Sequence, residues 1–202
     1  MKIYSPSPFA SWIFTALYFA WAVFELGYVN LILERRWRGG TKHEADRWSR
    51  PAIFAAMFGA FALAWPATAI RRFDIAPGSG LRSGVFYSGL ALMAGGLVFR
   101  YWAIRALGRY FAPTVSLESD HRMVEAGLYR YIRHPSYTGT FITILGYGLA
   151  LTNWLSLIVM LVLPGLAYEY RMRVEERMLI ETFGEEYREY MKRTKRIIPF
   201  IL

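Results

Sequence analysis

A dense polar segment lies in the second half of the chain, directly before a long apolar stretch. Within nine residues it places arginine, histidine, serine and tyrosine side chains, which can bind anions, move protons or cover a cation. These residues are Tyr129, Arg130, Tyr131, Arg133, His134, Ser136 and Tyr137. No charged residue follows until Glu169. Pro135 suits the first turn of a helix, where its missing N–H costs nothing.

Two interpretations of this segment compete. The simpler one is an interfacial collar, in which arginine and tyrosine anchor a helix end at the edge of a bilayer. The other is a ligand site, and a pair of charged residues further along the chain favours it. Arg171 and Glu175 are four residues apart, so a helix would present them on one side. An exposed pair of this kind would contribute only ~0.3 to 0.5 kcal/mol. Here the pair directly follows an apolar stretch, where solvent is partly excluded.

The residue inventory limits the chemistry. The chain has no cysteine, which excludes thiol nucleophiles, disulfide scaffolds and cysteine-based metal sites. Its three histidines, at 43, 121 and 134, are scattered, so we expect no metal. The sequence contains no phosphate-binding loop, zinc-protease motif or serine nucleophile elbow. Aromatic, histidine, carboxylate and arginine groups at a lipid interface suit transfer of an alkyl group from a cationic donor to a lipid-borne acceptor.

The composition predicts that membrane helices position these groups. Of 202 residues, 55% are hydrophobic and 17% aromatic, which exceeds the usual soluble composition. The net charge is +9, but the basic residues fall in short blocks between apolar stretches, as in cytoplasmic loops. We therefore expect no nucleic-acid partner. The first apolar stretch is longer than a signal-peptide core, so we expect it to be retained.

Five apolar stretches are long enough to be membrane helices. The polar break at Leu151-Thr152-Asn153 divides the longest uncharged run into the two helices of a tight hairpin. The predicted helices are 9–33, 51–70, 83–104, 135–150 and 154–170.

Two of these helices carry charged residues. Glu25 in the first should face other helices or a polar cavity, either as a functional group or as an interhelical partner. We assign neither Glu25 nor Arg100 a role in the site. Arg100 lies near the end of the third helix, from which its side chain can extend to the interface. Gly89, Gly95 and Gly96 of that helix should allow a close helix contact.

The loop charges predict the orientation. With the N-terminus outside, nineteen lysines and arginines lie inside, in 35–50, 105–133 and 171–196, against four outside. This is a strong positive-inside bias, so the polar segment should face the cytosol.

The C-terminal segment is expected to be a separate helix on that face. Its large side chains recur every fourth residue over 169–196. They are Leu179, Phe183, Tyr187 and Met191. The basic end, 192–196, should lie against anionic membrane lipids.

Several motifs resemble, in order and spacing, the C-terminal half of the isoprenylcysteine carboxyl methyltransferases, and together they cover residues 114–199. The motifs are His121-Arg122-Met123-Val124, Gly127-Leu128-Tyr129, Arg133-His134-Pro135-Ser136-Tyr137, Arg171 with Glu175-Glu176, and Phe183-Gly184-Glu185-Glu186-Tyr187 with Tyr190. The expected fold is an all-α membrane bundle without a Rossmann domain. Residues 1–105 would form three membrane helices, and residues 106–202 a methyltransferase core.

The resemblance implies an S-adenosylmethionine cofactor in a cytosol-facing pocket. Its implied contacts are Thr114, His121, Arg122, Met123, Val124, Tyr129, His134, Pro135, Ser136, Tyr137 and Glu175. Arg171 would hold the acceptor carboxylate, and Arg171 and Glu175 would be the catalytic residues. A carboxylate is ionised at neutral pH, so methyl esterification needs no general base. The expected reaction is carboxyl methylation of an isoprenylcysteine-like or other lipophilic acceptor, whose tail enters from the bilayer.

Three alternatives stay open at this point. The chain could methylate a phospholipid amine or a small thiol, and Arg171 would then matter less. It could be a nicotinamide-dependent membrane reductase with a similar pocket. It could also be a catalytically silent membrane scaffold, in which the polar segment is only a collar. We expect the chain to cross a membrane several times. If the source is prokaryotic, that membrane is expected to be the plasma membrane.

Overall fold

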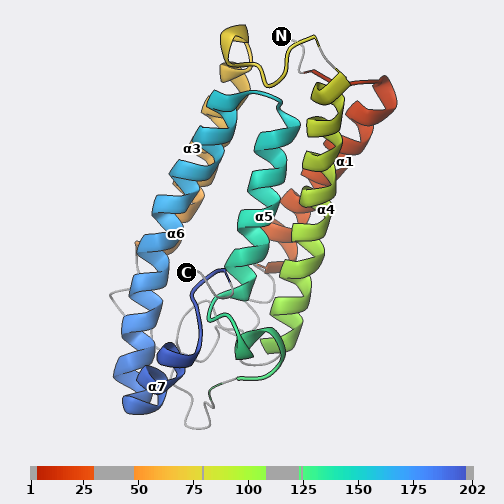
Figure 1. Ribbon diagram of the computed structural model, residues 1–202. Coiled ribbons are helices and arrows are strands. Elements are labelled where there is room, and N and C mark those ends of the chain that lie inside the picture. The colour runs from red at the N-terminus through yellow and green to blue at the C-terminus, as the bar shows by residue number, and fades with distance from the viewer. Residues whose placement is uncertain (1–3, 30–47, 79, 108–122, 124, 199–202) are drawn as a thin grey trace.

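The computed structural model describes residues 4–29, 48–78, 80–107, 123 and 125–198. Over these residues the chain forms a bundle of long helices (Figure 1). The elements are α1 (Pro8–Ala22), the π-helical turn η1 (Val23–Val29), α3 (Ser49–Ala67), the 3-10 turn η4 (Arg71–Phe73), α4 (Gly80–Leu107), the 3-10 turn η6 (Gly127–Arg130), α5 (Pro135–Ala150), α6 (Trp154–Phe183) and α7 (Glu185–Arg193).

Helix α5 lies in the middle of the bundle, between α4 and α6 (Figure 1). Helix α3 packs beside α6, and α1 beside α4. Aromatic rings join these layers in the core. The ring of Tyr147 on α5 lies 4.9 Å from that of Phe61 on α3 and 5.2 Å from that of Phe14 on α1, measured between centroids. The predicted all-α bundle is confirmed.

The outer faces of the helices are apolar. Ile158, Val162 and Leu166 on α6 recur every fourth residue and are all exposed, which is the pattern of a lipid-facing stripe. Four helices among the described residues have the length and composition to cross a membrane: Pro8–Gly27, α3, α4 and α6. Helix α5, with 16 residues, is shorter and is the enclosed fifth member of the bundle. The chain is therefore a multi-pass membrane protein.

Glycines bring the backbones of α4 and α5 together. A Cβ added to Gly89 would lie 2.5 Å from the amide nitrogen of Ala150, and one added to Gly146 would lie 2.5 Å from that of Met93. Gly96 faces α5 in the same way, so its predicted role and that of Gly89 are confirmed. The prediction for Gly95 was wrong, because this residue is exposed and nothing lies within 4 Å of an added Cβ.

The predicted turn between the last two membrane helices is confirmed. Asn153 caps α6 by accepting a hydrogen bond from the amide of Ser156 at 3.1 Å. The turn also holds the connection between α3 and α4, since the amide of Ile75 donates to the carbonyl of Thr152 at 2.9 Å. One end of the bundle is thereby tied together.

The boundary predicted near residue 170 was wrong. Helix α6 continues without interruption for 30 residues to Phe183, so the charged segment after the membrane helix belongs to the same element. The helix ends at Gly184, whose φ of +58° favours glycine. Helix α7 follows, and the chain then returns to the polar segment. The amides of Arg133 and His134 donate to the carbonyls of Lys195 at 2.7 Å and Arg196 at 3.0 Å.

Arg100 does not extend to the interface, which corrects the sequence prediction. Its side chain is buried, and its guanidinium donates to Oε1 of Glu25 at 2.8 Å. Glu25 accordingly faces another helix, as predicted, and serves as an interhelical partner. The first helix is described as far as Val29; the rest of the predicted range to 33 lies outside the described residues.

Candidate functional site

The polar segment meets the charged half of α6, residues 169–183, at the end of the bundle opposite the 151–153 turn. His134 precedes α5, and its ring stacks on that of Tyr137 with a centroid distance of 5.3 Å and an interplanar angle of 10°. The hydroxyl of Tyr137 donates to Oε2 of Glu175 at 2.7 Å and accepts from Nε of Arg171 at 3.3 Å. Four predicted site residues are thus brought together. We call His134, Tyr137, Arg171 and Glu175 the central cluster.

Arg171 is held firmly in this cluster. Its Nη1 donates to Oγ of Ser49 at 2.6 Å, and its Nε lies 3.8 Å from Oε2 of Glu175. The residue is 5% exposed, so the alternative of a solvated surface ion pair was wrong. Ser49 begins α3 and comes from a part of the chain that carried no signal in the sequence.

Glu175 and Glu176 are adjacent but have different environments. The Glu175 side chain is 24% exposed, whereas that of Glu176 is 4% exposed. Glu176 accepts from Nε of Arg133 at 2.9 Å and from Nη2 of Arg196 at 2.6 Å, and Nε2 of His134 lies 3.4 Å from its Oε1. Glu176 therefore organises the polar segment, whereas Glu175 stays accessible to a ligand.

Arg133 and Arg196 fasten the C-terminal segment over the site. Arg133 donates through Nη1 to the carbonyl of Met191 at 3.1 Å and to the carbonyl of Thr194. Hydrogen bonding to Glu176 raises the pKa of Arg196 above its usual value. Arg196 thus does not lie against lipid headgroups as predicted. The sequence motifs contained Arg133 and Glu176, but nothing in the sequence showed that they pair.

Of the other predicted cofactor contacts, some lie among the described residues and some lie outside them. Ser136 is buried, and its Oγ has no hydrogen-bond partner among the described residues. Pro135 begins α5, as expected. Met123 is half-buried. Four contacts lie outside the described residues: Thr114, His121, Arg122 and Val124.

The hydroxyl of Tyr129 contacts α4 and not the central cluster. The hydroxyl donates to the carbonyl of Ala103 at 3.4 Å, and the Tyr129 carbonyl accepts from the hydroxyl of Tyr190 at 2.6 Å. Burial raises the pKa of both tyrosines, so both hydroxyls stay protonated well above neutral pH. Tyr129 thereby links η6, α4 and α7 below the site.

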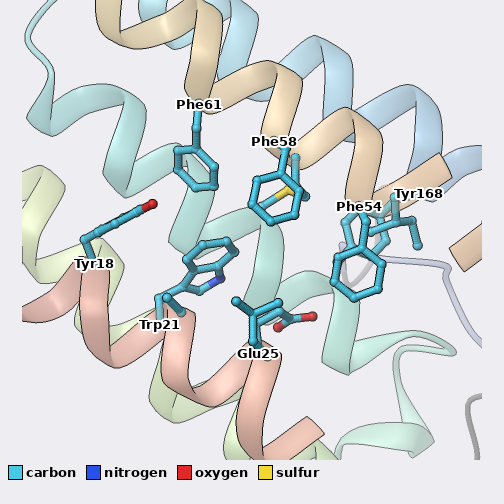
Figure 2. Close-up of a pocket in the computed structure, with 11 residues that line it drawn as sticks. Tyr18, Trp21, Glu25, Phe54, Phe58, Phe61 and Tyr168 are labelled. Atoms are coloured by element: carbon cyan, nitrogen blue, oxygen red, sulfur yellow. The ribbon is translucent and has the colours of Figure 1, made fainter. Parts of the chain in front are cut away.

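An aromatic pocket lies between α1, η1, α3 and α6 (Figure 2). The side chains labelled in Figure 2 are Tyr18, Trp21, Glu25, Phe54, Phe58, Phe61 and Tyr168. Tyr168 connects the pocket to the central cluster, because its ring centroid lies 5.0 Å from that of Tyr137. Phe58 lines the pocket and is 61% exposed, so the pocket reaches the outer surface of the bundle. Its residues are dispersed from 18 to 168, and the sequence analysis did not identify them as a group.

Comparison with known proteins finds a match to the part of the chain that carries the site. The family model of the isoprenylcysteine carboxyl methyltransferase (ICMT) family matches residues 89–181, which include the whole central cluster. Residues 89–181 are thus similar to the ICMT family. The matched segment begins within α4 and ends near the end of α6, so it also contains the glycine contact between α4 and α5.

Two curated relatives are similar to more than half of the chain. The protein-S-isoprenylcysteine O-methyltransferase of Saccharomyces cerevisiae is 40% identical over 115 residues, which are 56% of this chain and 48% of the relative. A probable protein-S-isoprenylcysteine O-methyltransferase of Oryza sativa subsp. indica is 34% identical over 119 residues, covering 58% of this chain and 62% of the relative. The chain thus spans less than two thirds of either relative.

A solved ICMT structure shares the fold. It is that of a eukaryotic intramembrane Ras methyltransferase, with a TM-score of 0.59 and 29% sequence identity. The match covers 70% of this chain and 51% of the other. The arrangement of membrane helices described above therefore resembles that of this ICMT structure.

Proposed function

We propose that the chain is an S-adenosylmethionine-dependent membrane methyltransferase that esterifies the carboxylate of an isoprenylcysteine-like lipophilic acceptor. The observation that carries the proposal is the convergence of His134, Tyr137, Arg171 and Glu175 beside an apolar pocket. The family match over residues 89–181 and the names of the relatives support it.

The residues around α5 fit the donor. Adenosylmethionine carries an ammonium group, hydroxyls and a sulfonium, and when bound it supplies an activated methyl group. Glu175 offers a partly exposed carboxylate for the ammonium group, and the faces of the stacked His134 and Tyr137 rings suit a cation. The buried Oγ of Ser136 has no partner among the described residues, so it offers a further hydrogen bond.

Arg171 is assigned to the acceptor. A guanidinium can hold a carboxylate by two parallel hydrogen bonds, and the contacts with Ser49 and Tyr137 fix its plane. The acceptor carboxylate is ionised at neutral pH, so the chain needs no base to activate it. The work of the site is to orient two reactants and exclude water, which can give a large rate gain. Lysine should replace Arg171 poorly, because it cannot reproduce the planar geometry.

The aromatic pocket is assigned to the hydrocarbon tail of the acceptor. Its walls are almost entirely apolar, and it connects the outer surface near Phe58 with Tyr168 beside the central cluster. A tail entering from the bilayer would therefore place the polar end of the acceptor near Arg171. The strong positive-inside bias supports a cytosolic orientation of this end of the bundle, in the plasma membrane if the source is prokaryotic.

Calorimetric titration of the detergent-purified protein with adenosylmethionine tests this proposal. We expect micromolar binding by the wild type, loss of binding in His134→Ala and Glu175→Ala, and retained binding in Arg171→Ala. Arg173→Ala and Glu185→Ala are matched controls, since their side chains are 68% and 67% exposed. Methyl transfer to a farnesylcysteine derivative should then require Arg171.

Each alternative predicts a different result. Transfer to a phospholipid amine that survives Arg171→Ala would replace the carboxylate acceptor. Binding of NADPH in place of adenosylmethionine would indicate a reductase. No binding of either cofactor by the wild type would leave a membrane scaffold as the better account.

A further inference from the structure

Arg100 is a buried cation that the proposed reaction does not use directly. It lies on α4 at a point of close backbone contact with α5, since a Cβ added to Gly139 would lie 2.7 Å from the amide nitrogen of Arg100. Only 4% of the residue is exposed. A charge in such a place is costly unless it is paired and hydrogen-bonded.

The guanidinium of Arg100 contacts the first turns of α5. Its Nη1 donates to the carbonyl of Ser136 at 3.0 Å and to the hydroxyl of Thr140. Ser136 is adjacent to Tyr137, whose hydroxyl contacts both Glu175 and Arg171. The position of Arg100 therefore sets the position of the α5 turn that carries part of the central cluster.

Glu25 fixes the other side of the guanidinium. Its Oε1 accepts from Nη2 of Arg100 at 2.8 Å, and the two side chains are 16% and 5% exposed. Tyr168 of α6 also contacts Arg100. Glu25 belongs to η1, outside the family-matched residues, and it lines the aromatic pocket (Figure 2). One ion pair thus joins the N-terminal helix, the pocket and the first turn of α5.

We propose that Arg100, held by Glu25, is a positioning residue that sets the first turn of α5 for donor binding. This inference rests on the proposed function, because the donor is adenosylmethionine. Glu25 serves as the point at which the N-terminal half of the chain controls the site. Loss of the Glu25 charge lets the guanidinium move, and with it Ser136 and Tyr137.

A second ion pair in the bundle offers a matched control. Arg82 on the same helix pairs with Asp74 at 3.1 Å, with side chains 14% and 6% exposed. Arg82 also donates to Oγ1 of Thr152, so it too ties α4 to the α5–α6 hairpin. This pair lies at the far end of α4 from the central cluster. It has the same structural role without contact to the first turn of α5.

The experiment compares Glu25→Gln, Thr140→Val and Arg100→Lys with Asp74→Asn and Arg82→Lys. Calorimetry gives the Kd for adenosylmethionine, and the binding stoichiometry gives the fraction of folded protein. A residue with a purely structural role would change the folded fraction and leave the Kd unchanged. We expect Glu25→Gln and Thr140→Val to raise the Kd by about tenfold, the effect of one lost charge-assisted hydrogen bond. The Asp74 and Arg82 variants should lower the folded fraction and leave the Kd within about twofold of the wild type.

The outcomes separate this inference from the function on which it rests. A wild type that binds no adenosylmethionine removes both. A wild type that binds, with Glu25→Gln and Thr140→Val unchanged in Kd, overturns only the positioning role. Equal weakening in the Asp74 and Arg82 variants overturns it as well, because the effect would then be general to buried pairs. If Arg100→Lys does not fold, the near-isosteric Glu25 and Thr140 variants still decide the question.

Discussion

Two adjacent glutamates divide the work of the site between them. Glu176 is surrounded by Arg133, Arg196 and His134, so its carboxylate is already fully engaged within the protein. Glu175 contacts Tyr137 and remains partly exposed. The same side chain thus has a structural role at one position and a proposed binding role at the next.

Neutralising each glutamate should have opposite consequences. Glu176→Gln leaves two partly buried arginines, Arg133 and Arg196, without the counter-charge of a buried carboxylate, so we expect the thermal unfolding midpoint in detergent to fall by about 5 to 10 °C. Glu175→Gln should change the midpoint by less than about 2 °C and abolish adenosylmethionine binding. Differential scanning calorimetry and titration measure the two effects. An unchanged midpoint in Glu176→Gln would contradict the structural role.

The sequence predicted the residues of the central cluster but not their supports. His134, Tyr137, Arg171 and Glu175 are polar residues at the ends of apolar stretches, which is a visible pattern. Ser49 and the pair of Glu25 with Arg100 depend on which helices pack together. Spacing along a single chain does not contain that information, so these contacts were found only in the structure.

At the scale of elements, the contact between α4 and α5 determines how the site is built. The two backbones approach so closely that even a methyl group between them would meet main-chain atoms. This contact holds α5 rigidly in the centre of the bundle, so His134 and Tyr137 are attached to a fixed base.

Gly146→Ala tests this contact. The added Cβ would lie 2.5 Å from the amide nitrogen of Met93, so the helices must separate. Overpacking of this kind costs about 1 to 3 kcal/mol, which we expect to lower the unfolding midpoint by several degrees. The control is Gly95→Ala, which has open space around it and gains helix propensity. A Gly146→Ala midpoint at or above that of Gly95→Ala would show that the contact is not tight.

Helix α7 packs its tyrosines against the site, and this predicts a pH dependence. Burial raises the pKa of Tyr187 and Tyr190 above the ordinary value of 10. As the pH rises past 10, the unfolded chain loses these protons first, so stability present below pH 10 should decline above it. Tyr187→Phe should reduce this decline by up to about 1.4 kcal/mol per pH unit. Exposed Tyr131→Phe is the control, and denaturant titrations between pH 8 and about 11 are the measurement.

The helix boundaries show where sequence reasoning succeeds. The 135–150 helix and the 151–153 turn were predicted correctly, because proline, asparagine and a polar break mark them. The end of α6 was missed because the sequence changes from apolar to charged residues within this helix. Such a change moves a helix from lipid into water but does not end it. Gly184 is what ends it, through its positive φ.

At the scale of the whole molecule, the two ends of the bundle differ. One end holds the compact turn around Thr152, closed by the pair of Arg82 with Asp74. The other end holds the site, α7 and most of the basic residues that the structure describes. Because basic segments stay on the cytosolic side of a membrane, this asymmetry predicts that the end with the site faces the cytosol.

The absence of native cysteine makes this orientation directly measurable. Arg72→Cys and Arg188→Cys each add a single thiol at an exposed position, one at each end. We expect a membrane-impermeant maleimide to label Arg72→Cys in intact cells and Arg188→Cys only after permeabilisation. The reverse pattern would place the site outside the cell.

The length of α6 has a consequence for the surrounding lipid. Its 30 residues extend about 45 Å, so a single uninterrupted helix both crosses the hydrocarbon region and carries Arg171, Glu175 and Glu176. A helix adapts to a thinner or thicker bilayer by changing its tilt. Any such tilt also displaces the charged half of α6 relative to α5. Hydrophobic mismatch is therefore coupled to the geometry of the central cluster, and we expect the rate of the proposed methyl transfer to depend on acyl-chain length.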